Sequence, residues 1–264
     1  MSERKKYSVS TDIAGRTLTL ETGTLAEQAD GAVSARYGDT LLLATVVGAK
    51  ESREGVDFFP LTVDYEEKMY AAGKIPGNYF KREGKPTTTA ILTARLTDRP
   101  LRPLFHKEYK NEIQVIITTF CIDMVNDPGP LAIIAASAAL SISDIPFQGP
   151  VGAVQVGHIE GQFVINPMMS EIEKSALDLY VAGSKDAVLM VEAGAYELSE
   201  DDMLQAIQQG HDECKKIVAL QEELVALCGI PKREFIPPDP DTSLEEAIAN
   251  YVRTRLQDAI NHPD

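Results

Sequence analysis

The feature that most constrains the fold is a run of apolar residues, LLLATVV, at positions 41–47. Such a run is apolar on both faces of an extended chain and is typical of a central strand that is buried on both sides. Two alternating stretches precede it, at 7–13 and 16–21, with Ala14-Gly15 between them as a hairpin turn. The pattern predicts a sheet with 41–47 in its middle, and further strands are predicted at 32–37, 61–65 and 113–122.

Helical signals alternate with these strands. Pro86 begins a helical pattern that we expect to end near Asp98, because a residue before proline, here Arg99, is biased out of the α region. The segment LAIIAASAALSIS follows a proline- and glycine-containing turn, and its small residues predict a buried, closely packed helix. A second set of strands is predicted at 151–156, 162–165, 177–182 and 187–192, with glycines between them.

The composition changes after about residue 198. Ser199 is a suitable N-cap for a long amphipathic helix over 199–229. A proline-rich linker follows at 230–241, and 242–264 begins a further helix. We therefore predict a first domain at 1–198 and a helical segment at 199–264, which the chain leaves incomplete.

A basic island lies at residues 74–110, KIPGNYFKREGKPTTTAILTARLTDRPLRPLFHKEYK. It carries a formal charge of +6 in a chain of net charge −15, which leaves −21 on the rest. Repulsion from the acidic remainder should direct polyanions to this one region. Tyr79 and Phe80 directly precede Lys81 and Arg82, and rings beside cations are the ingredients of single-strand nucleic-acid binding. The alternative is a solvated basic loop.

Targeting and metal signals are missing from the sequence. The start, MSERKKYSVSTDIAG, has no apolar run after its bases, and no window offers 18 consecutive apolar residues. The four histidines are scattered, and the three cysteines lack metal spacing. We expect a cytoplasmic protein that does not enter a membrane, and we assign no metal to this chain.

Three long segments resemble the first core domain of the bacterial polynucleotide phosphorylase (polyribonucleotide nucleotidyltransferase) family. They are GKIPGNYFKREGKPTTTAILTARLTDRPLRPLF, AASAALSISDIPFQGPVGAVQVG and LDLYVAGSKDAVLMVEAGAYELSEDDMLQAI, in this order. The resemblance implies an α+β, ribonuclease-PH-like domain with mixed sheets and packed helices, followed by part of an all-α segment. It further implies a phosphorolytic 3′-to-5′ exoribonuclease that uses Mg²⁺ and inorganic phosphate, forms a homotrimeric ring with a central RNA channel, and has degradosome-type protein partners.

The resemblance also assigns roles to the basic island. The family's Phe-Phe-Arg-Arg loop binds RNA at the channel neck, and here it reads Tyr79, Phe80, Lys81, Arg82. Lysine lacks the bidentate fork of arginine, so a somewhat weaker grip is expected. Stacking of a base on an aromatic ring contributes roughly 1–3 kcal/mol, more than an exposed charge pair at roughly 0–1 kcal/mol. Phe80→Ala should therefore weaken short-RNA binding more than Lys81→Ala, and equal losses would contradict this ranking.

Three more arginines, Arg95, Arg99 and Arg102, match family residues that face RNA or phosphate. Their alternative role is ion pairing within the chain, with acids such as Asp98, Glu66 and Glu67.

The family's reaction centre has the pattern D-x5-D-x-K ahead of V-A-G. Alignment on Val181-Ala182-Gly183 places Asp178 at the second aspartate, Ile172 at the first and Tyr180 at the lysine. A lone carboxylate is a poor Mg²⁺ site, because the metal needs several oxygen ligands. This half is therefore expected to be catalytically inert, with its Mg²⁺ in a second core domain. Two alternatives stay open: a non-catalytic RNA-binding ring subunit, and a stand-alone ribonuclease-PH-type enzyme.

Overall fold

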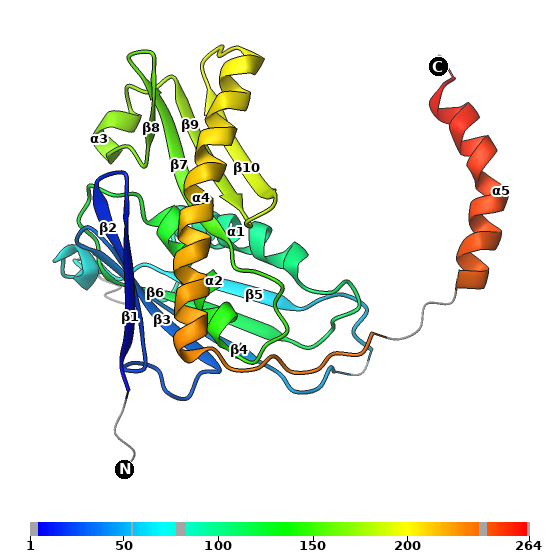
Figure 1. Cartoon of the computed structure of the whole chain (residues 1–264), viewed down its shortest axis with the longest axis horizontal. Coiled ribbons are helices and arrows are strands. Elements are labelled where there is room, and N and C mark those ends of the chain that lie inside the picture. The colour runs from blue at the N-terminus through cyan, green and yellow to red at the C-terminus, as the bar shows by residue number, and fades with distance from the viewer. Residues whose placement is uncertain (1–4, 54, 78–82, 238–241, 263–264) are drawn as a thin grey trace. The chain divides into compact units, whose positions relative to one another are not determined.

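The computed structural model describes residues 5–53, 55–77, 83–237 and 242–262. The chain divides into two compact units, one that ends at Glu234 and one that begins at Phe235, and each is described by itself. The first unit contains two β-sheets with helices packed on them (Figure 1). The predicted α+β fold is confirmed.

The larger sheet has six strands in the order β1-β2-β3-β4-β6-β5. All neighbours are antiparallel except β5 and β6, which are parallel, so this sheet is mixed. The strands are β1 (Tyr7–Ile13), β2 (Arg16–Thr22), β3 (Gly31–Tyr37), β4 (Thr40–Gly48), β5 (Leu61–Glu66) and β6 (Ile113–Cys121).

Strand β4 lies between β3 and β6, as its apolar run predicts, but it is not buried on both faces. Leu42, Ala44 and Val46 are fully buried, whereas Val47 is 50% exposed. The residues that alternate with these three, Leu41, Leu43 and Thr45, keep partial contact with solvent. Helix α2 (Pro128–Ile142) packs on β3 and β4, and the residues of β4 that are fully buried alternate along the strand. The apolar run therefore predicts the central position of the strand correctly, but the predicted burial on both faces is wrong.

The smaller sheet has four strands in the order β10-β9-β7-β8, all antiparallel. They are β7 (Gly152–Ile159), β8 (Gln162–Ile165), β9 (Leu177–Gly183) and β10 (Val188–Ala195). Strands β7 and β9 are almost wholly buried, while β10 forms an edge and most of its residues are exposed.

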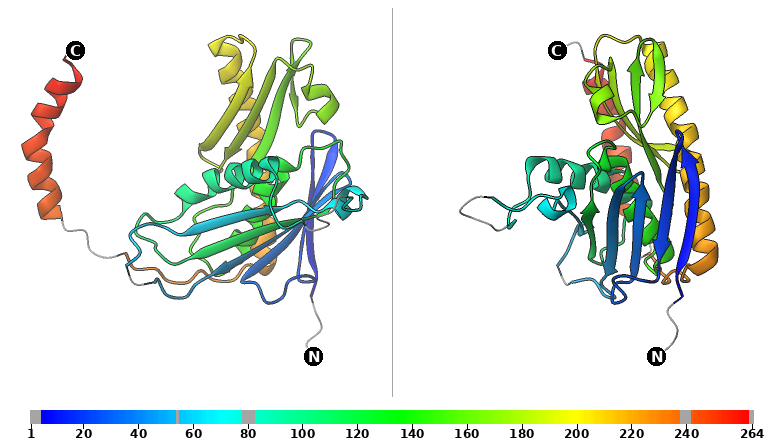
Figure 2. Two further views of the ribbon diagram at one scale, coloured as in Figure 1. Left: turned by 180° about the vertical axis from the view of Figure 1, so that it is seen from behind. Right: turned by 90° about the vertical axis from the view of Figure 1, so that its left-hand side faces the viewer.

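Two helices hold the sheets together. Helix α2 begins at its N-cap Asp127 with Pro128 in the first turn, and it is buried from Gly129 to Ile142 because its small residues permit close approach. Helix α4 (Glu200–Cys228) runs along both sheets and contacts β1, β7 and β9 (Figures 1 and 2). The domain boundary predicted at residue 198 stays a prediction, and in the structure α4 belongs to the unit that ends at Glu234.

Helix α1 (Thr88–Leu101) continues past Asp98, so the expected stop at that residue is wrong. Pro100 lies in the last turn, where its missing N–H removes a single helical hydrogen bond. The Arg102 N–H still bonds the Asp98 carbonyl, and Pro100 itself is buried. Three short helical elements were not predicted: η1 (Met69–Ala72), η2 (Arg102–Leu104) and α3 (Met169–Ile172).

The linker after α4 is held at its beginning by contacts with the end of α2 and with neighbouring loops. The Lys232 Nζ donates to the carbonyl oxygens of Leu140, Ser141 and Ser143, at 2.7, 2.9 and 2.8 Å. These carbonyls belong to the end of α2, where a cation is favourable. Burial lowers the pKa of Lys232 to about 8. The neighbouring Arg233 pairs with Asp144 and Asp30, at 2.7 and 3.1 Å.

The second unit contains helix α5 (Thr242–Ile260), which has no buried residue. Several of its apolar residues recur at helical spacing and are exposed, including Leu244, Ile248, Tyr251 and Leu256. In the described parts of the chain, no helix is both long and apolar enough to span a bilayer.

Candidate nucleic-acid interface

Helix α1 and its C-cap residue, Arg102, present the three predicted arginines together. Arg95, Arg99 and Arg102 follow one another at spacings of four and three residues, which places them on neighbouring positions of one helix face. The helix begins at Thr87, whose hydroxyl accepts from the Ala90 N–H at 3.0 Å. This cap fixes the residue at which the helix starts.

The arginine row borders a groove between α1 and the edge strand β5. The groove has a volume of about 500 Å³ and is floored by small residues of α1, Ala90 and Ala94. Strand β5 forms the other wall with Thr62 and Asp64. A groove beside a row of cations is suited to an extended anionic chain.

Arg102 is held by the protein itself. Its Nε and Nη2 donate to the Asp98 carboxylate at 2.9 and 2.7 Å, and its Nη1 and Nη2 donate to the Phe59 and Leu61 carbonyls, each at 3.1 Å. The guanidinium also lies 5.6 Å from the centre of the Phe59 ring. All three of its nitrogens are therefore engaged, and the pairing with Asp98 suggested by the sequence is present.

The other two arginines are less constrained. Arg99 Nη1 donates to a single carboxylate oxygen of Glu192 on β10, and no hydrogen bond joins its Nε or Nη2 to another described residue. Arg95 is exposed, and within the described ranges it makes neither a hydrogen bond nor an ion pair. Neither arginine pairs with Glu66 or Glu67 there. These two guanidiniums are the ones most available to a phosphate.

A second groove of about 790 Å³ adjoins the first, and the two share Asp64, Tyr65 and Pro86. It adds three lysines, Lys68, Lys74 and Lys85, and it reaches Gly77 and Glu83. The predicted aromatic and basic loop residues Tyr79, Phe80, Lys81 and Arg82 lie outside the described residues, between those two positions.

The residues aligned with a reaction centre form a different arrangement, at the beginning of α2. The Tyr180 hydroxyl donates to Asp127 Oδ2 at 2.5 Å, while Asp127 Oδ1 accepts from the Gly129 N–H at 3.0 Å. Gln155 Nε2 donates to Asp178 Oδ1 at 2.7 Å and to the Tyr180 hydroxyl at 3.3 Å. Ile172, aligned with the first aspartate, ends α3.

Burial dominates the electrostatics of this centre. It raises the pKa of the Tyr180 hydroxyl, and the negative charge of Asp127 raises it further. It also raises the pKa of Asp127, against the opposing effect of the hydrogen bonds from Tyr180 and Gly129, while the charge of Asp178 adds to the rise. A carboxylate with a raised pKa holds its proton more tightly, which is the opposite of what a metal ligand needs.

The residues present do not fit Mg²⁺. Asp127 and Asp178 each already accept a hydrogen bond from a neighbouring side chain, and Tyr180 stands where a lysine is expected. Within the described ranges, no three His, Cys, Asp or Glu residues lie close enough together to hold a metal ion. The N-terminus of α2, which attracts anions, is already capped by the carboxylate of Asp127.

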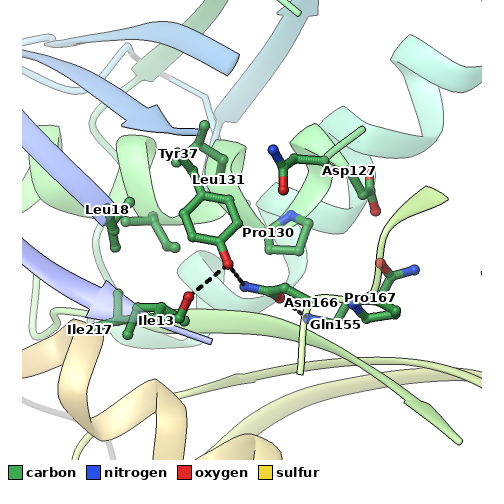
Figure 3. Close-up of a pocket in the computed structure, with 12 residues that line it drawn as sticks. Ile13, Leu18, Tyr37, Asp127, Pro130, Leu131, Gln155, Asn166, Pro167 and Ile217 are labelled. Carbon is green, nitrogen blue, oxygen red and sulfur yellow. Dashed lines mark hydrogen bonds between the residues drawn. The ribbon is translucent and has the colours of Figure 1, made fainter. Parts of the chain in front are cut away.

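A small internal cavity lies beside this centre (Figure 3). Figure 3 shows the Tyr37 hydroxyl between Ile13 and Asn166, where it donates to the Ile13 carbonyl at 2.9 Å and accepts from Asn166 Nδ2 at 3.4 Å. Asp127 and Gln155 line the same cavity. Polar side chains therefore link the two sheets around the aligned residues, which favours a structural role for them.

Sequence reasoning missed three residues that matter here: Glu192, Asp127 and Gln155. Asp127 precedes Pro128 and could have been recognised as an N-cap, but not as the partner of Tyr180, 53 residues away. Glu192 ends the strand predicted at 187–192 and lies in β10, but nothing in the sequence around it indicates its contact with Arg99. Gln155 carries no local signal for its contacts.

The fold and the matches to family models define the class. Residues 14–146 match the model of the 3′ exoribonuclease family, domain 1, and residues 149–213 match that of domain 2. The chain therefore belongs to the 3′ exoribonuclease family. A solved structure of rice Rrp46 supports the fold with a TM-score of 0.63 at 18% identity, covering 84% of this chain and 95% of that one.

Several curated relatives of this chain carry the name polyribonucleotide nucleotidyltransferase. The protein from Chloroflexus aggregans is 74% identical over 263 residues, and the protein from Roseiflexus sp. is 70% identical over 264 residues. The protein from Heliobacterium modesticaldum is 56% identical over 255 residues. The chain is covered to 97–100% by these matches but spans only about a third of the relatives' length, 35–36%. The expected family resemblance is confirmed.

Proposed function

We propose that the chain is the RNA-binding first part of a phosphate-dependent 3′-to-5′ exoribonuclease, a polyribonucleotide nucleotidyltransferase that degrades mRNA to nucleoside diphosphates. The name of the relatives at 56–74% identity supports this assignment. The observation that carries it in the structure is the arginine row of α1 beside its groove. Nothing in this proposal requires chemistry from the chain itself.

In this proposal, RNA lies along α1 and β5 and is held through its phosphates. Arg95 and Arg99 make the direct contacts, because within the described part of the chain their guanidinium groups keep unpaired donors. Arg102 contributes charge while its nitrogens hold α1 to β5. On the basis of the family resemblance, Tyr79, Phe80, Lys81 and Arg82 add stacking on bases and pairing with phosphates.

Phosphorolysis then takes place in a second core domain, which supplies the Mg²⁺ site and binds inorganic phosphate. The hydrogen bonds of Asp127, Asp178 and Tyr180 support this division, because both carboxyl groups of the aligned centre are already engaged by neighbouring side chains. We also propose a homotrimeric ring, a cytoplasmic location and degradosome-type partners for the whole protein, on the basis of the family resemblance.

RNA binding is tested by fluorescence anisotropy with a labelled oligo(A) and the full 264-residue chain. The chain should bind, and its affinity should fall steeply as salt rises, because each neutralised phosphate releases counterions. An affinity independent of salt, or no binding at low salt, would overturn the proposed grip.

The division of labour is tested separately by incubating the chain with oligo(A), phosphate and Mg²⁺. No ADP should form. Release of ADP at an ordinary enzymatic rate would show that this half is a stand-alone ribonuclease-PH-type enzyme, while leaving the RNA-binding result untouched.

A further inference from the structure

Glu192 is the carboxylate that β10 brings to the arginine row. It lies 93 residues from Arg99 in the sequence, yet one of its oxygens accepts a hydrogen bond from Arg99 Nη1. The side chains are 48% and 54% exposed, so water and solutes reach both members of the pair. An ion pair of this kind contributes about 0–1 kcal/mol and exchanges readily with other partners.

The ion pairs of Arg99 and Arg102 differ in how many guanidinium donors they leave for a phosphate. Asp98 holds Arg102 through two oxygens, and backbone carbonyls take the remaining donors. Glu192 holds Arg99 through one nitrogen only. A phosphate can form two parallel hydrogen bonds with a guanidinium, which is a stronger arrangement than a single bond. A phosphate entering the groove can therefore displace Glu192 from Arg99, whereas it cannot displace the partners of Arg102 as easily.

We infer that Glu192 competes with RNA phosphate for Arg99 and thereby lowers the affinity of the groove for RNA. This inference rests on the proposed RNA-binding function of the groove. The carboxylate occupies one donor that a phosphate would use, and its charge opposes a phosphate at the same position. A strand that advances during degradation has to break each phosphate contact in turn, and a resident competitor on β10 makes that exchange easier.

The test is a titration of labelled oligo(A), at several salt concentrations, with the full chain and three variants: Glu192→Gln, Arg99→Ala and the double variant. Gln has the size of Glu and keeps an acceptor oxygen, but it lacks the charge. Glu192→Gln should tighten RNA binding about three- to tenfold at low salt. It should also steepen the dependence of log K on log salt by about 0.7, the contribution of one more phosphate contact on a single strand.

The effect has to act through Arg99. The double variant should therefore bind RNA no more tightly than Arg99→Ala alone. Glu173→Gln is the matched control, since it removes one exposed carboxylate from α3's end and should leave the affinity within about twofold. Thermal unfolding of each variant checks that the fold is unchanged.

Two results would overturn the inference. If Glu192→Gln weakens binding or leaves it unchanged, the carboxylate orients Arg99 or has no part in binding. If the gain persists in the Arg99→Ala background, it comes from net charge alone. Both results leave RNA binding by the groove intact, whereas a parent chain that does not bind oligo(A) would remove the proposed function together with the inference.

Discussion

The arginine groove of α1 and the polar centre at the start of α2 use ionic side chains in opposite ways. In the groove, Arg95 and Arg99 are exposed, and among the described residues their donors are unpaired or held by one replaceable carboxylate. At the centre, Asp127 and Asp178 accept hydrogen bonds from Tyr180 and Gln155, and burial raises the pKa of Asp127. The comparison indicates that availability of donors and acceptors, and not the presence of charged residues, separates a binding site from a structural one.

The largest effect is expected at the polar centre. Tyr180→Phe removes the hydroxyl that donates to Asp127 and leaves a partly buried carboxyl group short of a partner. The free energy of unfolding should fall by about 1–3 kcal/mol, the usual result of leaving a buried polar group unsatisfied. Urea unfolding measures the loss, and RNA affinity should not change. A drop in RNA affinity with unchanged stability would reverse the roles assigned to the two regions.

The next effect is on RNA binding. Arg95→Ala combined with Arg99→Ala should weaken oligo(A) binding about tenfold at low salt, which corresponds to about 1.4 kcal/mol. Anisotropy titrations measure this change. The matched control is Lys174→Ala with Lys185→Ala, which removes the same charge from exposed positions around the smaller sheet. Equal losses in both double variants would mean that net charge alone directs RNA to the chain.

Arg102 should behave differently from its two neighbours on α1. Arg102→Ala removes hydrogen bonds to Asp98 and to two backbone carbonyls, so stability should fall by about 1 kcal/mol. Arg95→Ala should leave the unfolding transition in place. Thermal unfolding of the two variants measures the difference. Similar melting curves would contradict a structural role for Arg102 that Arg95 lacks.

The smallest effect concerns the protonation of Asp127. Its pKa is raised in the folded chain, so its stabilising contribution is present below the unfolded value near 3.8 and is lost as pH rises through the folded pKa. Asp127→Asn cannot titrate. The stability of the parent chain relative to this variant should therefore decline as the pH increases above about 4, as measured by urea unfolding at several pH values.

If the stability of the parent chain relative to Asp127→Asn instead increases with pH, the raised pKa assigned to Asp127 is wrong. Asp127 would then be ionised in the fold and stabilised by the N-terminus of α2.

Local signals predicted most of the fold. Alternation and turn residues located the β1–β2 hairpin, and the small residues of 131–143 located the buried helix α2. The rule that a residue before proline leaves the helical conformation failed at Arg99. Helix α1 continues through Pro100, which is buried, because the helix loses only one hydrogen bond there.

The candidate site was predictable only in part. The spacing of Arg95, Arg99 and Arg102 on a helix places them together without any knowledge of the tertiary fold. Their partners differ in this respect: Asp98 is one turn from Arg102, whereas Glu192 reaches Arg99 only because β10 packs beside α1. The Tyr180–Asp127 contact likewise depends on how β9 meets α2, which no local pattern encodes.

The central claim is that RNA lies in the groove between α1 and β5. Photo-crosslinking of the full chain to a 4-thiouridine oligonucleotide, followed by mass spectrometry of the peptides, tests it most directly. The account predicts cross-links to peptides that contain β5 and residues 83–102. Cross-links concentrated on peptides of β7 and β9, around Gln155 and Tyr180, would contradict it.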